Sequence, residues 1–180
     1  MSSLQNISVF IKFSQYIQTQ EFVFHKDKLI RSSQYFEIVI LECEELNLPI
    51  KIILPTFATV ECLIIFKDFI NNRSLNIDHC EIELYKQLVL LSTFFKCTSL
   101  IDEVEHCFSN KLNNFNAIDI YNFSSSQNRL ETLNQVAWIF IVENFESIYK
   151  NEQWSSLRRV KQMKAMASFC DRVCLRQYLN

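Results

Sequence analysis

The stretch EFVFHKDKLIRSSQYF, Glu21–Phe36, changes its pattern twice and decides the fold class of this chain. It opens with a strand-like run at Glu21–Phe24, which stops at His25-Lys26, and a short helical pattern around Leu29 follows. A histidine and a lysine at the end of a strand have two explanations. They are either a catalytic pair or a structural corner at which the strand turns into a helix.

The residues on both sides of this stretch extend the pattern. Apolar residues alternate with polar ones over Ile7–Phe13, which predicts a half-buried strand that pairs with Glu21–Phe24 as a hairpin. Ser32 or Ser33 is a suitable N-cap for a helix from Gln34 to about Cys43, because a serine hydroxyl accepts a hydrogen bond from the first turn.

A third strand and a buried helix come next. Pro49–Leu54 places apolar residues at every second position, and Pro55 ends the strand. Thr56 is the expected N-cap of a helix over Phe57–Ile70, which is apolar around most of its circumference and should therefore be deeply buried.

The remainder of the chain shows helical patterns throughout. They cover Leu84–Phe95, Leu100–Leu112, a short segment from Ala117 and a long segment over Leu130–Ile148, with one or two basic helices after it. A small sheet with most of the chain helical predicts the α+β class.

Composition excludes several function classes. The 180 residues are 49% hydrophobic and 21% charged, as in a globular protein, and the net charge of −2 gives no basic field for nucleic acid or an anionic membrane. Arg158–Arg176 is locally basic, and we expect a solvated helix face there rather than an RNA or lipid site. No apolar run reaches the ~20 residues that a membrane helix needs.

The cysteines and the first residues indicate the compartment. Seven cysteines are spread without a paired framework, and the opening MSSLQNISVF lacks the basic start and long apolar run of a secretory leader. We therefore expect free, mostly buried thiols in a cytoplasmic or nuclear protein.

The chain contains no glycine, which removes every glycine-dependent phosphate loop and the nucleophile elbow. Turns must use residues that tolerate a left-handed backbone, and Asn71–Ser74 and Asn113–Asn116 fit that need. The three histidines lie in different predicted elements, and Cys170 and Cys174 form a single pair at helical spacing without a second one. We therefore expect no catalytic residue, cofactor or metal, and a protein that is not an enzyme.

Four segments, in this order, resemble a BTB/POZ domain followed by the start of a BACK domain. They read FVFHKDKLIRSSQYF from Phe22, IILPTFATVECLIIFKDFINNRSLNI from Ile52, LYKQLVLLSTFFKCTSLIDEVEHCFSNKL from Leu84 and NNFNAIDIYNFSSSQNRLETLNQVAWIFIVENFESI from Asn113. The resemblance implies a BTB/POZ domain over residues 6–113 and a partial BACK-like helical region over residues 114–180. Two positions depart from the family pattern: Asn6 stands near the usual aspartate, and Asn71-Asn72 replace a corner glycine.

The resemblance also implies partners. His25 would be a structural corner whose ring nitrogens are hydrogen-bonded, and Cys43, Glu44 and Glu45 would be the contact with cullin-3, where family members carry an apolar residue, any residue and a glutamate. A solvated acidic helix end is the alternative explanation of these three residues. The implied function is a homodimeric substrate adaptor of a cullin-3 ubiquitin ligase; the alternative is a dimerisation or decoy protein that pairs with other BTB proteins and recruits no client.

Overall fold

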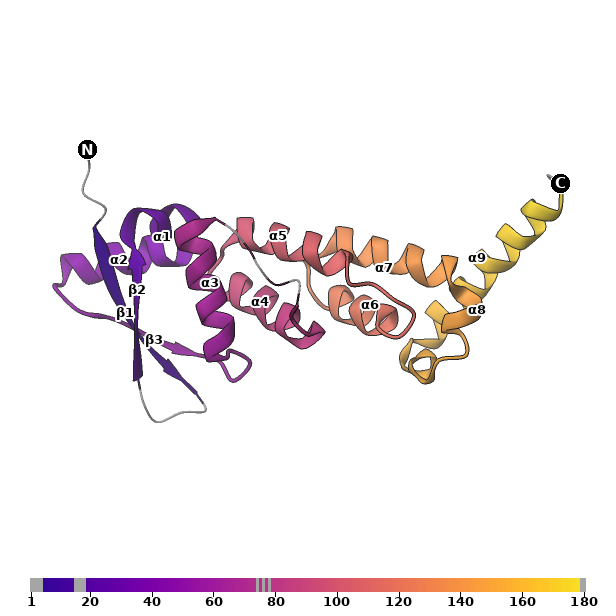
Figure 1. The fold of residues 1–180 in the computed structure, drawn as a ribbon, viewed down its shortest axis with the longest axis horizontal. Helices are drawn as coiled ribbons and strands as arrows, with labels where there is room; N and C mark the ends of the chain where they lie inside the picture. Colours follow the sequence, from indigo (N-terminus) through magenta and orange to yellow (C-terminus); the bar gives the residue numbers. More distant parts are fainter. Residues whose placement is uncertain (1–4, 15–18, 74, 76, 78, 179–180) are drawn as a thin grey trace. The chain divides into compact units, whose positions relative to one another are not determined.

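The computed structural model describes residues 5–14, 19–73, 75, 77 and 79–178, with the surroundings of side chains given as far as Arg172. The chain divides into two compact units, Met1–Val104 and Glu105–Asn180. A small mixed sheet lies in the first unit and the remaining elements are helical, so the predicted α+β class is confirmed (Figure 1). The domain division at residues 113 and 114 stays a prediction.

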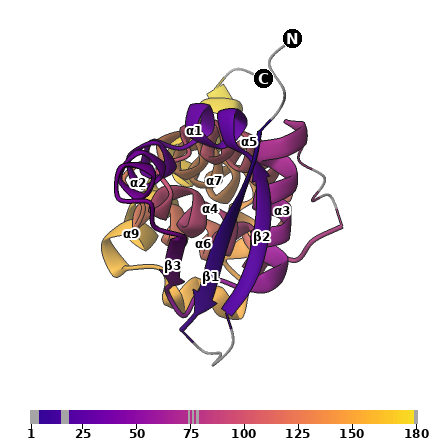
Figure 2. The same cartoon turned by 90° about the vertical axis from the view of Figure 1, so that its left-hand side faces the viewer.

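The sheet has three strands: β1 (Asn6–Phe13), β2 (Thr19–His25) and β3 (Ile50–Leu54). Their order is β2-β1-β3, with β1 in the centre (Figure 2). β2 is antiparallel to β1, and β3 is parallel to it, with Val9 opposite Ile50. All three predicted strands and the predicted pairing of the first two are confirmed.

The two faces of the sheet differ as the alternating sequence requires. The inner face is fully or almost fully buried; it carries Val9, Ile11, Phe13, Phe22, Phe24, Ile50, Ile52 and Leu54. The outer face carries the half-buried Phe10 and the exposed Val23 and Ile53. Helices of the first unit therefore cover one face only.

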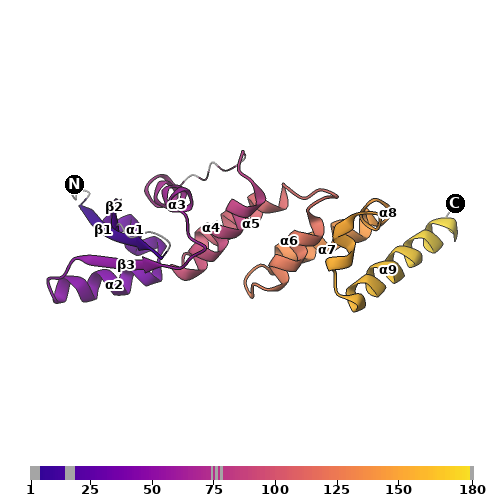
Figure 3. The same cartoon turned by 90° about the horizontal axis from the view of Figure 1, so that it is seen from below.

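The first four helices are α1 (Lys26–Ser32), α2 (Gln34–Glu45), α3 (Val60–Asn72) and α4 (Ile82–Phe94). α1 follows β2 with no loop between them. Ser33 is the N-cap of α2, because its hydroxyl oxygen accepts from the Phe36 N–H at 3.2 Å. The Ser33 hydroxyl also donates to the Phe95 carbonyl at 2.5 Å, and α2 lies alongside β3 (Figure 3).

The predicted start of the next helix is wrong. α3 begins at Val60 and not at Phe57, because the Ala58 N–H bonds to the Pro55 carbonyl at 3.1 Å and closes a turn first. Thr59, rather than Thr56, is the N-cap, and its hydroxyl oxygen accepts from the Cys62 N–H at 3.2 Å.

Four phenylalanines form the centre of the first unit. Phe24, Phe36, Phe66 and Phe95 are each fully buried, and they come from β2, α2, α3 and the end of α4. The ring centroids of Phe36 and Phe95 are 4.7 Å apart, and those of Phe66 and Phe95 are 4.9 Å apart. Tilted aromatic pairs of this kind add to the free energy gained from burial.

The second unit is helical in the part that the structure describes. α5 (Thr98–Ser109) contains the boundary, and α6 (Ala117–Ser125), α7 (Glu131–Glu143), α8 (Phe145–Ile148), the 3₁₀ turn η1 (Glu152–Ser156) and α9 (Arg159–Tyr178) follow. The single helix expected over Leu130–Ile148 is wrong. It breaks at Asn144, whose side-chain amide donates back to the Phe140 carbonyl at 3.0 Å.

An aromatic cluster joins the last elements of this unit. Phe145 stacks on Phe169 of α9, with ring centroids 4.8 Å apart, and meets Trp154 of η1 edge-on at 5.5 Å. Arg172 donates to the Val142 carbonyl. No helix within the described ranges is both long enough and apolar enough to cross a membrane.

Turns without glycine are built in two ways. Asn47, Arg73 and Lys96 adopt positive φ angles of 53°, 57° and 52°. In the predicted turn Asn71–Ser74 the left-handed residue is thus an arginine. The turn at Asn113–Asn116 instead uses side chains: the Asn113 amide oxygen accepts from the Phe115 N–H at 2.9 Å, and the Asn116 amide oxygen accepts from the Asn113 N–H at 2.8 Å.

Candidate functional site

The predicted contact residues lie in the last turn of α2, and the backbone fixes where this helix ends. The Leu48 N–H donates to the Cys43 carbonyl at 2.8 Å, and the Asn47 N–H donates to the Glu44 carbonyl at 3.2 Å. With Asn47 left-handed, these two bonds make a Schellman motif, the usual end of a helix. The turn therefore presents Leu46 and Leu48 at a defined corner.

The two motifs that the sequence singled out meet in space. Lys26, which follows the histidine corner, forms an ion pair with Glu44, the middle residue of the acidic cluster. The Glu44 side chain is 47% exposed, so the pair is worth at most about 1 kcal/mol of stability. Its main effect is to hold the Glu44 carboxylate toward α1, whereas Glu42 and Glu45 are exposed and form no such ion pair with any residue that the structure describes.

The helix separates Cys43 from Glu45. Residues two apart on a helix are rotated by about 200° around the helix axis, so their side chains point to nearly opposite sides. Cys43 is half-buried and lies near Tyr35. Burial raises the pKa of the Tyr35 hydroxyl, and the neighbouring charge of Cys43 raises it further. The predicted trio of Cys43, Glu44 and Glu45 therefore does not form a single surface.

Glu45 shares its helix face with apolar residues that the sequence analysis missed. Ile38 and Leu41 lie seven and four residues before it, a spacing that places all three on one side of α2. Their exposed fractions are 47% and 54%, and those of Leu46 and Leu48 at the corner are 68% and 57%. We call Ile38, Leu41, Glu45, Leu46 and Leu48 the α2-end surface. Its helical spacing is visible in the sequence, but only the structure shows that these residues are uncovered.

His25 occupies a corner in the structure, at the last position of β2 and directly before α1. Its backbone N–H donates to the Asn71 amide oxygen at 3.3 Å, and Lys28 donates to the Asn71 carbonyl, so Asn71 ties the corner to the end of α3. The imidazole Nδ1 is buried without a hydrogen-bond partner. The expectation that both ring nitrogens are hydrogen-bonded is therefore wrong for Nδ1, because the backbone and not the ring makes the bond to Asn71.

The thiols are less buried than expected. Cys62 and Cys97 are buried, Cys43, Cys80 and Cys107 are half-buried, and Cys170 is exposed. Burial raises the pKa of the Cys62 thiol to about 12 and also raises the pKa of the Cys97 thiol. In the part of the chain that the structure describes, no three side chains among His, Cys, Asp and Glu come together as metal ligands.

The α2-end surface thus combines exposed apolar side chains with the exposed carboxylate of Glu45, and Glu42 on the same side of the helix is exposed as well. Exposed apolar patches with a polar rim are typical of protein-binding surfaces. Comparison with known proteins finds no family model and no curated protein that matches the chain. The likeness to BTB/POZ and BACK domains rests on the sequence motifs and is compatible with the α+β architecture.

Proposed function

We propose that this chain is a protein–protein interaction module of the BTB/POZ and BACK type, which forms homodimers and serves as a substrate adaptor of a cullin-3 ubiquitin ligase. The observation that carries the proposal is the α2-end surface, where Ile38, Leu41 and Glu45 share one exposed helix face. No residue of the chain does chemistry in this function. The adaptor acts by holding a client near the ligase, and it requires a cytoplasmic or nuclear location.

The physical basis is burial of apolar area beside one charge. Burying an exposed Leu or Ile side chain contributes about 1.5–3 kcal/mol before the costs of association. Glu45 adds specificity, because a carboxylate at the rim of an apolar patch favours a partner with a donor or cation opposite it. The ion pair with Lys26 holds the Glu44 carboxylate toward α1 and so away from that contact.

Titration calorimetry against a cullin-3 N-terminal domain, at one moderate salt concentration, tests the proposal. We expect a Kd near or below about 1 μM, which is ~−8 kcal/mol. Glu45→Ala and Leu41→Asp should both weaken binding. The matched controls are Glu103→Ala, an exposed glutamate on α5, and Ile64→Asp on α3, where the isoleucine is 47% exposed. Neither control should change the Kd by more than about twofold, since single exposed charges contribute little.

The absence of any heat at several temperatures would refute the cullin contact. In that case the placement of Cys43 favours a second function. Cys43 points away from Glu45, so it cannot be the apolar residue that contacts the cullin beside this glutamate. The chain would then pair with longer BTB proteins and recruit no client. Binding to the BTB part of such a protein, together with no binding to the cullin domain, would distinguish this decoy from the adaptor.

A further inference from the structure

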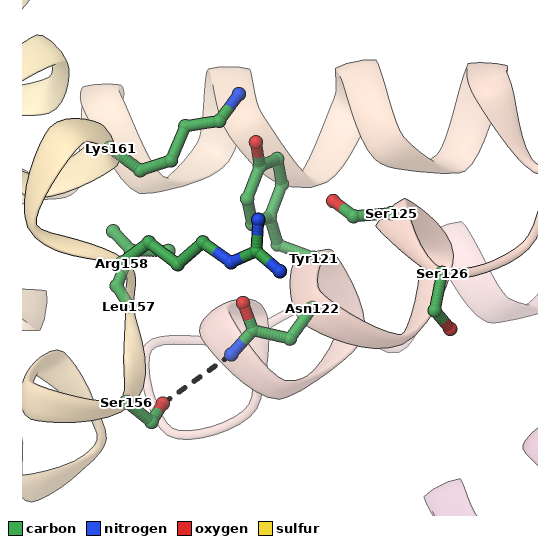
Figure 4. A pocket seen from close by; sticks show the side chains of 8 residues that line it. All are labelled: Tyr121, Asn122, Ser125, Ser126, Ser156, Leu157, Arg158 and Lys161. Carbon is green, nitrogen blue, oxygen red and sulfur yellow. Dashed lines mark hydrogen bonds between the residues drawn. The ribbon is translucent and has the colours of Figure 1, made fainter.

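A cavity of about 350 Å³ lies in the second unit, where α6 faces the segment that joins η1 to α9 (Figure 4). Two cationic side chains line it, Arg158 and Lys161, with Asn122, Ser125 and Ser156 among its polar walls. None of the residues that line it is an aspartate or a glutamate. A hollow lined by two positive charges and by no carboxylate favours an anion, although Lys161 also borders a neighbouring hollow that is lined in part by Asp171.

Aromatic rings hold the Lys161 ammonium in place. Its Nζ lies 5.5 Å from the ring centroid of Tyr121 and 5.6 Å from that of Trp138, and these two rings are 5.5 Å apart. Such cation–π contacts restrain the ammonium without using its N–H donors. Arg158 is exposed, and its guanidinium extends from the same side as Lys161 toward Tyr121 and Asn122 (Figure 4). Both cations therefore border the same hollow.

Neutral donors complete the site. The Ser125 hydroxyl oxygen accepts from the Asn134 amide at 2.7 Å, so its own O–H is available to donate to a ligand. The Asn122 amide donates to the Ser156 hydroxyl at 3.4 Å, which links α6 to the end of η1 at the cavity wall (Figure 4). α9 begins at Arg159, next to the cavity, and the N-terminus of a long helix adds positive potential there.

The geometry points to a phosphate monoester as the ligand, specifically the side chain of a phosphoserine or phosphothreonine in a partner protein. A guanidinium matches two phosphate oxygens at once, and a lysine supplies the second charge. A nucleotide fits less well, because Tyr121 is only 4% exposed and its ring packs on Trp138, which leaves no ring face for a base to stack on. All lining residues lie within Glu105–Asn180, so this site does not depend on the proposed cullin contact.

NMR titration of the ¹⁵N-labelled full chain tests the site. The probes are N-acetyl-phosphoserine amide and N-acetyl-serine amide at constant ionic strength. We expect saturable shifts of the backbone amides of Ser125, Ser156 and Arg158 with the phosphorylated probe and none with the other. Arg158→Glu should weaken binding about tenfold or more, because it removes the bidentate donor and adds repulsion. The same reversal at Arg159, an exposed neighbour that does not line the cavity, should change it by less than about threefold.

Three results would overturn the assignment. One is equal shifts with the serine and phosphoserine probes, and another is equal weakening by Arg158→Glu and Arg159→Glu, which would indicate a general basic surface. The third is that a single-stranded RNA oligomer binds more tightly than the phosphorylated probe and that both variants weaken this binding equally. Because Arg158 and Arg159 are both exposed, neither substitution threatens the fold.

Discussion

Non-glycine residues carry the left-handed turns of this chain, and their side chains decide what each turn costs. Asn47 and Lys96 both have positive φ. Asparagine tolerates this conformation because a short polar side chain can bond locally, whereas the Cβ of a lysine crowds the following carbonyl at a cost of about 1–2 kcal/mol. Lys96 ends α4 in a Schellman motif, with the Cys97 N–H donating to the Ser92 carbonyl at 2.8 Å. This is the position at which glycine is usual.

Lys96→Gly should raise the free energy of unfolding by about 1 kcal/mol. Relief of the Cβ clash outweighs the extra entropy that glycine gives to the unfolded chain. Urea denaturation followed by circular dichroism measures the change. Asn47→Gly is the matched control and should gain less; a loss of stability in Lys96→Gly would contradict the argument.

The buried thiol of Cys62 makes the free energy of unfolding depend on pH. Cys62 is fully buried, and burial, with the charge of Glu61 second, raises the pKa of its thiol from 9.0 to about 12. Between these values the unfolded chain has released a proton that the folded chain keeps, so the unfolded state binds fewer protons and stability falls as pH rises. From pH 8 to pH 10 this thiol alone should lower the free energy of unfolding by about 1.4 kcal/mol.

Chemical denaturation of the parent chain and of Cys62→Ala at pH 8 and pH 10 isolates this contribution. The substitution creates a cavity and lowers stability at both pH values, so only the difference between the two values is compared. Other groups with raised pKa, such as Cys97, remain in both proteins. The same pH dependence in the variant as in the parent would show that Cys62 does not cause it.

At the scale of single elements, two threonines lie near the start of α3, and only Thr59 caps the helix. Thr59 accepts from the Cys62 N–H at 3.2 Å and donates to the Gln87 amide oxygen of α4 at 3.0 Å. Thr59→Ala should cost about 1–2 kcal/mol, because it removes both the N-cap and the link between the helices. Thermal unfolding checks this value. Thr56→Ala is the control; Thr56 is exposed in the preceding turn, and an equal loss there would mean that the cap lies elsewhere.

The same helix shows what the sequence could and could not predict. Apolar spacing predicted β1, β2, β3 and the presence of α3, because alternation and helical periods depend only on neighbouring residues. The start of α3 depends on a backbone hydrogen bond between Ala58 and Pro55, and no side-chain pattern indicates it. Asn144 likewise interrupts an apolar pattern that continues on both sides of it.

The candidate site was likewise predictable from the sequence only in part. The acidic end of α2 was visible as a cluster, but the geometry of the helix places Cys43 and Glu45 on opposite sides. The Lys26–Glu44 pair joins residues 18 positions apart on two consecutive helices, a spacing that no local helix motif predicts. No local motif predicts the cavity bordered by Arg158 and Lys161 either, because its walls come from α6 and from the start of α9.

At the scale of the whole molecule, the net charge of −2 gives no strong overall field that would steer partners. In the first unit, uncovered apolar area is therefore the main surface feature that favours association. Among the residues of the first unit that the structure describes, two such areas stand out. One is the α2-end surface, and the other is the outer face of the sheet, where Val23 is 41% and Ile53 is 69% exposed and Phe10 is half-buried. The exposed charged side chains that lie between these apolar ones are Lys12, Glu21 and Lys51. If the first binds a cullin domain, the second is left for a copy of the chain.

The proposed homodimer should therefore depend on Ile53. In a two-fold interface each substitution acts twice, so Ile53→Asp should raise the dimer Kd by well over about tenfold, because it removes two buried isoleucines and introduces two charges. Sedimentation velocity over a range of concentrations measures the shift from twice the 21.4 kDa chain mass to a single chain. Ile139→Asp is the matched control, since Ile139 is 53% exposed on α7 of the other unit. A chain that stays monomeric at every concentration would refute the dimer, whereas a dimer equally sensitive to both substitutions would place its interface away from the sheet.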